Sequence, residues 1–256
     1  MIIAAFNPKG GVGKTTTAVN VAASLARSDK SVLLVDLEAD LNASISLGVG
    51  PGHGTPSIAD VLLHERRAAD AVRPVPRIDN LHLIPGSRGL AHIDERLRNV
   101  RQPERRLADV IRPLVPQFDA IVLDCPSGYS LVSLSIPIAA QQLVIPMRAD
   151  YLSLESLAQF LRWYRDRRES RRASAHLTGI LLTMVDYRRP ATREIVDIIR
   201  VHNARGVFRT EIPHDQRVPE APSHGVPLAQ YAGRCRAAVA YDRFTSELMK
   251  RVVARA

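Results

Sequence analysis

A glycine-rich loop near the start of the chain carries the residues best suited to chemistry. Residues 7–16 read NPKGGVGKTT. Glycines let backbone N–H groups curl round a phosphate, Lys14 neutralises its charge, and the Thr15 hydroxyl can serve Mg²⁺. We therefore expect a nucleoside triphosphate site formed by Gly10, Gly11, Val12, Gly13, Lys14, Thr15 and Thr16.

The segments on either side have the patterns that such a loop requires. The apolar run at residues 2–6 predicts a buried strand, and Ala18, Val21, Ala22 and Leu25 follow a helical period. Strand, loop and helix thus follow one another without a gap. The positive end of the helix dipole adds to the potential that attracts phosphate.

The loop departs from the ordinary G-x-x-x-x-G-K-[ST] spacing. Pro8 stands where the first glycine is expected, and a second lysine, Lys9, follows it. Only four of the 35 Lys and Arg residues are lysines, and two of those four lie in this loop. Because lysine and arginine are not interchangeable at a phosphate, this distribution favours a functional loop over a chance glycine-rich turn.

A second pattern with chemical meaning lies at residues 118–126, which read FDAIVLDCP. An apolar strand that ends in an acid has the form of a Walker B element, in which Asp124 holds Mg²⁺ through its water shell. We interpret Cys125 as a small core residue, because no histidine lies near it in the sequence.

These motifs resemble those of the deviant Walker A ATPases, and within them the ParA/Soj type that segregates plasmids and chromosomes. The resemblance extends from Ile2 to about Val252. It implies ATP and Mg²⁺ as cofactors, an ATP-sandwiched homodimer and a ParB-like adaptor that accelerates hydrolysis. It also implies catalytic and nucleotide-binding roles for Lys14 and for Lys9, which in the family reaches the nucleotide of the partner subunit.

Residues 36–44 resemble the D-x-D-P-Q-x-N-A segment of that family. The resemblance places Asp36 near the Mg²⁺ shell and assigns the acid that orients the attacking water to Glu38, where the family has aspartate. The Glu38 carboxylate sits one methylene further out, and in-line attack depends on placement, so we expect slow hydrolysis. Solvated loop acids are the alternative interpretation of Glu38 and Asp40.

Residues 212–225, IPHDQRVPEAPSHG, match the family signature I-P-x-x-x-R-x-x-E-A-P-S-x-G. The resemblance places Pro213, together with Met184, at the nucleotide. It assigns Arg188 and Arg217 to a surface that binds double-stranded DNA without reading its sequence. Surface arginines without such a role are the alternative for these two residues.

Composition sets broad limits on the protein class. A net charge of +9 and a pI of about 10.1 fit either a polyanionic partner or an arginine-rich solvated surface. No apolar stretch approaches the roughly 20 residues of a membrane span. The chain starts with a strand pattern rather than a signal peptide, and its two cysteines lack metal-ligand spacing. We expect a cytoplasmic, nucleoid-associated protein.

Strand signals alternate with helical ones along the whole chain. This order predicts one α/β P-loop NTPase domain over residues 1–256, with about seven strands in a mainly parallel, helix-flanked twisted sheet and the nucleotide at the carboxyl ends of the strands. The last strand is expected at 207–212 and the last helix at 234–253. We expect no N-terminal helix-turn-helix extension.

Two further surfaces leave alternatives open. The arginines between positions 162 and 172 form either a DNA-facing ridge or a salt-bridged helix end. The last helix is amphipathic and ends in Lys250, Arg251 and Arg255, which keeps a MinD-like membrane-associated positioning ATPase as a rival. A ParA-like ATPase that positions a non-DNA cargo on the nucleoid would share the same biochemistry.

Overall fold

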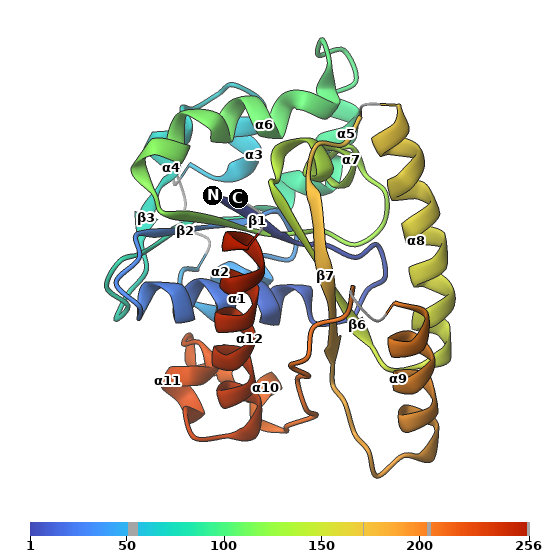
Figure 1. The fold of residues 1–256 in the computed structure, drawn as a ribbon. Coiled ribbons are helices and arrows are strands. Elements are labelled where there is room, and N and C mark those ends of the chain that lie inside the picture. Colours follow the sequence, from blue (N-terminus) through green and yellow to red (C-terminus); the bar gives the residue numbers. More distant parts are fainter. Residues whose placement is uncertain (51–55, 171, 204–205, 255–256) are drawn as a thin grey trace.

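A twisted sheet runs through the centre of the molecule (Figure 1). The computed structural model describes residues 1–50, 56–170, 172–203 and 206–254. Within those ranges the sheet has seven strands in the order β3-β4-β2-β5-β1-β6-β7, all parallel to their neighbours except β3 with β4. The strands are β1 (Ile2–Ala5), β2 (Val32–Asp36), β3 (Arg73–Pro74), β4 (Leu81–Ile84), β5 (Ala120–Asp124), β6 (Gln142–Arg148) and β7 (His176–Thr183).

The central strands are apolar except for the aspartates that end β2 and β5, because helices cover both faces of the sheet. Every residue of β1, β2 and β5 is buried, as expected for a parallel sheet packed on both sides. One face carries α3 (Ile58–Leu62), α4 (Ala68–Ala71), α5 (Ile93–Arg96), α6 (Arg106–Ile111), α7 (Leu131–Ala139), α8 (Tyr151–Glu169) and α9 (Pro190–His202). The other carries α1 (Lys14–Ala26), α2 (Asn42–Ser46), α10 (Arg217–Glu220), α11 (Leu228–Ala232) and α12 (Arg236–Val253).

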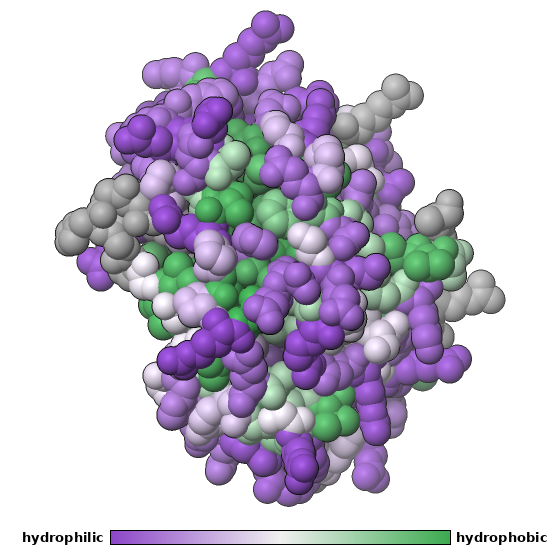
Figure 2. All heavy atoms as spheres, turned by 90° about the vertical axis from the view of Figure 1, so that its left-hand side faces the viewer, coloured by the Kyte–Doolittle hydropathy of each residue, from purple (hydrophilic) through white to green (hydrophobic). Residues whose placement is uncertain are grey.

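The predicted α/β class and mainly parallel sheet are confirmed. On the side that carries the β3 edge, hydrophilic side chains dominate the surface and apolar ones show between them (Figure 2). The carboxyl ends of β1, β2 and β5 meet at one edge of the sheet, where the glycine-rich loop follows β1 and where Asp36 and Asp124 are the last residues of β2 and β5.

The strand predicted at 207–212 is not formed as such. The segment runs beside β7 and donates to it from the backbone N–H groups of Phe208 and Ile212, each at 2.9 Å, but it forms only the isolated bridge Ile180–Val207 with that strand. The seventh strand is the short β3 instead. The carboxylate of Glu247 accepts hydrogen bonds from the backbone N–H groups of Arg209 and Thr210, at 2.8 and 2.9 Å. These two N–H groups therefore donate to a side chain and take no part in hydrogen bonds between strands.

The prediction for the last helix needs two corrections. The helix begins at Arg236, because the sulfur of Cys235 caps it by accepting from the Ala238 N–H. Not all of the apolar residues behind its predicted amphipathic pattern pack on the sheet: Phe244 and Leu248 are buried there, whereas Val239 is 38% exposed. Arg255, from the predicted basic end, and Arg171, from the 162–172 cluster, lie outside the described residues.

Candidate nucleotide site and basic groove

The glycine-rich loop joins β1 to α1 at the carboxyl edge of the sheet. Gly11 and Gly13 have φ angles of 69° and 85°, a region that glycine adopts without strain. Gly13 is the N-cap of α1. The Asn7 side chain holds the start of the loop, since its Oδ1 accepts from the Lys9 N–H at 3.0 Å and its Nδ2 donates to Pro146 O at 2.8 Å. Strand, loop and helix follow in the expected order.

The Lys14 ammonium lies inside this loop. Lys14 is 5% exposed, and its Nζ donates to Lys9 O at 3.2 Å and to the Ser127 hydroxyl at 2.9 Å. Burial lowers the pKa of Lys14, while the carboxylates of Glu38 and Asp124 oppose that shift. A buried cation between backbone N–H groups and acids suits a phosphate that carries Mg²⁺.

Asp36 and Asp124 face each other at the ends of β2 and β5, where they are register partners. Both are fully buried. The Oδ2 of Asp36 accepts from both the backbone N–H and the hydroxyl of Ser44, at 2.9 and 2.6 Å. In contrast, neither carboxylate oxygen of Asp124 has a hydrogen-bond partner in the part of the chain that the structure describes.

Asp124 therefore has the properties of a residue that serves a cation. Burial, and then the charge of Asp36, raises the pKa of Asp124 well above its usual range. The Thr15 side chain opposes this shift. A buried carboxylate without a close hydrogen bond is costly, and a nearby cation offsets that cost. No group of three His, Cys, Asp or Glu side chains among the described residues could hold a metal alone. Magnesium suits such a site, since it takes one or two carboxylates, phosphate oxygens and water. Thr15, the second residue of α1, would supply the hydroxyl oxygen.

Glu38 lies two residues beyond β2 and is half-buried. Burial raises the pKa of Glu38, and the charge of Lys14 opposes the shift. The backbone N–H of Glu38 donates to Asp36 Oδ1 at 3.1 Å. On the other side the chain passes very close to Gly86, where a Cβ atom would lie 2.6 Å from Glu38 O. The carboxylate is thus held near the Lys14 ammonium, and its role with the attacking water stays a prediction.

The second lysine of the loop is bound within its own chain. Lys9 Nζ donates to Asp150 Oδ1 at 3.1 Å and to the Ser153 hydroxyl at 2.8 Å. Asp150 is the N-cap of α8, where its side chain accepts from the Ser153 N–H. Burial opposes these hydrogen bonds, yet together with the Lys9 charge they lower the pKa of Asp150. A carboxylate on α8 therefore positions the Lys9 ammonium.

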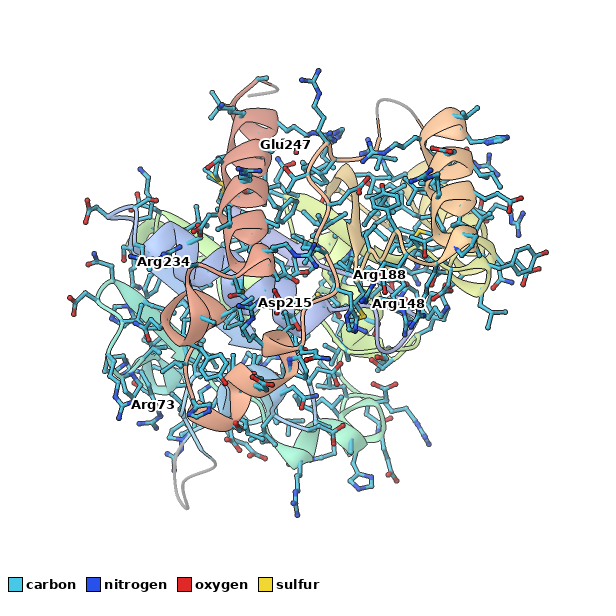
Figure 3. All side chains as sticks on the ribbon, turned by 90° about the horizontal axis from the view of Figure 1, so that it is seen from below. Arg73, Arg148, Arg188, Asp215, Arg234 and Glu247 are labelled. Carbon is cyan, nitrogen blue, oxygen red and sulfur yellow. The ribbon has the colours of Figure 1, made fainter. Side chains whose placement is uncertain are left out.

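A groove of about 1430 Å³ opens between the loop that follows β7 and the start of α12. It brings together Arg188 and Arg217, which are far apart in the sequence. Figure 3 shows this face, with Asp215 lying between Arg234 and Arg188. The charged residues that line the groove are six arginines and four acids: Arg188, Arg209, Arg217, Arg234, Arg236, Arg243, Asp186, Glu211, Asp215 and Glu220.

Comparisons with known proteins agree with this geometry. A family model described as an AAA domain matches residues 1–176. The chain is 35% identical to the chromosome partitioning protein ParA of Myxococcus xanthus over 98% of this chain and 88% of that protein. It is 34% identical to the sporulation initiation inhibitor protein Soj of Bacillus subtilis over 96% of this chain and 97% of that protein. The chain belongs to the ParA/Soj family.

A solved structure extends the comparison to ligands. Cobyrinic acid a,c-diamide synthase from Mycobacterium smegmatis, with a bound ATP analogue and magnesium, matches with a TM-score of 0.85 at 25% identity, over 100% of this chain and 96% of that one. Nucleotide and Mg²⁺ binding therefore occur on this fold. As a ParA/Soj member, the chain is a P-loop ATPase of the ParA/MinD type, which confirms the resemblance drawn from its motifs.

Met184 and Pro213, the two nucleotide contacts predicted outside the glycine-rich loop, lie in different places. Met184 is 36% exposed and follows β7. A Cβ atom at Gly13 would lie 3.8 Å from the Met184 methyl group, so this side chain stands beside the glycine-rich loop. Pro213 instead pairs with Val185 and lines the basic groove. Its contact with a nucleotide stays a prediction.

The membrane-associated rival within the ParA/MinD group depends on the last helix. Along α12 the apolar residues Phe244 and Leu248 are fully buried, so this face is occupied by the core. None of the helices in the described ranges combines the length and apolar character needed to cross a bilayer. Arg251 points inward, because its guanidinium donates to Val207 O at 2.6 Å and pairs with Glu247 at 3.0 Å.

Several residues that position this ParA/Soj site were missed by sequence reasoning. Ser44 donates hydrogen bonds to Asp36, and the backbone at Gly86 lies against the backbone of Glu38. Ser127 accepts a hydrogen bond from Lys14, and Asp150 and Ser153 accept hydrogen bonds from Lys9. The D-x-x-S spacing of an N-cap could have drawn attention to Asp150. The others are single small or polar residues without a pattern of their own.

Proposed function

We propose that this protein is an ATP-dependent switch that binds double-stranded DNA without reading its sequence and segregates plasmid or chromosomal DNA. In this proposal ATP and Mg²⁺ bridge two subunits into a homodimer on the nucleoid, and hydrolysis releases the DNA. A ParB-like adaptor, which the family resemblance implies, accelerates that hydrolysis.

The observation that supports this proposal is the loop after β7, which borders both candidate sites. Met184, its first residue, stands beside the glycine-rich loop. Arg188, four residues later, lines the basic groove. Hydrolysis or exchange of the nucleotide could therefore affect the groove through a segment of only four residues. Arg188 and Arg217 are the DNA contacts proposed from the family resemblance.

Within the nucleotide site, Lys14 would neutralise the transferred phosphate, and Thr15, Asp36 and Asp124 would hold Mg²⁺, which supplies positive charge to the phosphate oxygens. Glu38 would orient the attacking water. Its longer side chain places the carboxylate less accurately than aspartate would, so unstimulated turnover is slow. Lys9 would leave Asp150 and reach the nucleotide of the partner subunit.

Binding to a duplex of arbitrary sequence, compared in ATP·Mg²⁺ and in ADP·Mg²⁺, tests the proposal. We expect tight binding only with ATP, a steep loss with salt, and weaker binding for Arg217→Ala. Equal binding with both nucleotides, or none with either, would refute a nucleotide-gated DNA switch. Pelleting with anionic vesicles in the presence of ATP examines the membrane rival directly.

A further inference from the structure

The groove holds two classes of arginine that differ in their partners. Arg188 and Arg217 are each engaged by a carboxylate of their own chain. Arg188 donates through Nε and an Nη atom to both oxygens of Asp186, at 2.8 and 2.8 Å. Arg217 binds Asp215 in the same way, at 2.8 and 3.1 Å. In each arginine the fork formed by Nε and one Nη is therefore filled, and the carboxylate offsets the positive charge, while the second Nη keeps its donors free.

Protonation behaviour agrees with these two contacts. The hydrogen bonds from Arg188 lower the pKa of Asp186 to about 2. Burial acts in the opposite direction on Asp215, yet the hydrogen bonds from Arg217 lower the pKa of that carboxyl as well. Both acids stay ionised across the physiological range. For either arginine to take a phosphate through this fork and with its full charge, it must first exchange its carboxylate.

The other four arginines of the groove are free of such partners. The side chains of Arg209, Arg234, Arg236 and Arg243 are exposed and make no hydrogen bond or ion pair with any described residue. By contrast, each acid of the groove has a partner. Asp186 and Asp215 bind the arginines above, and the remaining two are bound by Arg200 and Tyr231.

Secondary structure sets the four free arginines on two facing walls. Arg236, Val239, Ala240 and Arg243 all line the groove, and their spacing of three, four and seven places them on one face of α12. Arg234 stands just before the helix (Figure 3). On the other wall, Glu247 fixes the backbone of Arg209 by accepting from its N–H at 2.8 Å.

We propose that Arg209, Arg234, Arg236 and Arg243 make the principal contacts to the phosphate backbone of the DNA, ahead of Arg188 and Arg217. This inference rests on the proposed function and names the residues that carry it. Four free guanidinium groups on two walls neutralise phosphates without losing an internal ion pair, and they bind any sequence because phosphates carry no sequence information.

The test compares three variants by duplex binding with ATP·Mg²⁺ across a salt series. The first replaces the four free arginines by alanine, and the second carries Arg188→Ala and Arg217→Ala. The third is a charge-matched control far from the groove, with alanine at four exposed arginines that have no acidic partner among the described residues: Arg98, Arg101, Arg105 and Arg112. A lysine version of the first variant restores charge without the fork.

Losing four phosphate contacts lowers the slope of log K against log salt by about 3 to 4 per chain. We expect that loss in the first variant, a smaller one in the second, little change in the control, and partial rescue by lysine. Thermal unfolding and fluorescent ATP-analogue binding should match the wild type in all four variants. Such a match would show that a loss of DNA binding comes from the groove and not from altered folding or nucleotide binding.

Three results would overturn the inference: a wild-type slope in the first variant, an equal loss in the control, or a larger loss in the second variant. If the wild-type protein binds DNA equally with ATP and with ADP, the proposed nucleotide-gated switch is refuted. The variants can still be compared in that case, so the assignment of the DNA contacts to the four free arginines is tested separately. Wild-type protein that binds phosphatidylglycerol vesicles and no DNA would overturn both.

Discussion

Arg106 offers a demanding test of how this fold is held together. The residue is 5% exposed, and its guanidinium fills the carboxyl end of α3. Its Nε donates to Leu62 O at 2.5 Å, an Nη atom donates to Val61 O at 3.3 Å, and the other Nη contacts the His64 ring. The last carbonyls of a helix have no partner within the helix, so Arg106 satisfies groups that would otherwise be buried and unpaired.

Replacement of Arg106 by methionine keeps much of the side-chain volume and removes every donor. Each carbonyl left buried without a partner costs about 1–3 kcal/mol, and the charged group removed no longer carries its own desolvation cost. We therefore expect a net loss of about 3 kcal/mol in the free energy of unfolding. For a chain of this size, that loss lowers the melting temperature by roughly 6–12 °C.

Urea unfolding followed by circular dichroism measures the loss, and Arg105→Met is the matched control. Arg105 is exposed and adjacent, so its replacement should change stability by no more than about 0.5 kcal/mol. A midpoint for Arg106→Met within about 1 kcal/mol of the wild type, or an equal loss in the control, would refute the reasoning. Arg106→Lys should fall between, because lysine keeps the charge without the fork.

Three further predictions concern other parts of the molecule. Burial raises the pKa of Tyr241 to about 12, so the folded state holds this proton more tightly than the unfolded chain. The resulting stability is complete below pH 10 and falls by about 2–3 kcal/mol as the pH approaches 12. The pKa of Tyr187 is also raised to about 12, so urea titrations at pH 9 and pH 11.5 should show an alkaline loss in both proteins that is smaller in Tyr241→Phe by the Tyr241 contribution. Gly225→Ala should cost about 1–3 kcal/mol in a thermal melt, because φ is 64° and the new Cβ would lie 2.9 Å from the Gly48 Cα. Asp150→Asn keeps the cap of α8 and removes the charge that holds Lys9. Because a partly exposed ion pair contributes on the order of 0.5–1 kcal/mol, ATP-dependent self-association should become two- to fivefold tighter. Sedimentation measures this change.

The first two of these predictions have control variants, and the third has an outcome that would contradict it. Tyr231→Phe alters a tyrosine near the surface and should leave the alkaline loss of stability in place. Gly50→Ala introduces a Cβ that meets nothing within 4 Å, so a loss equal to that of Gly225→Ala would contradict the steric argument. Unchanged self-association in Asp150→Asn would mean that the contact does not restrain Lys9.

Local patterns predicted the architecture well because parallel sheets leave strong signals. The central strands are continuous apolar runs, and each is followed by a helix period, so class and element order are readable without a structure. The prediction failed where a distant side chain intervened. Residues 207–212 have the composition of a strand, but Glu247 on α12 takes two of their backbone donors.

The basic stretch between 88 and 115 shows a similar limit. Its mixed charges indicate a solvated face, and most of its arginines are exposed. Arg106 is buried all the same, because the carboxyl end of α3 requires donors that its own helix cannot supply. Composition does not distinguish this arginine from its neighbours.

The sequence by itself determined the fold class, the glycine-rich loop with its two lysines, and the two acids that end β2 and β5. Those features depend on residues that are adjacent or periodic in the chain. Only the tertiary structure decided that Lys9 binds Asp150, that Asp124 is buried without a close hydrogen bond, and that four free arginines face one groove. These properties depend on which distant segments meet, and burial and pairing are set by that meeting rather than by local spacing.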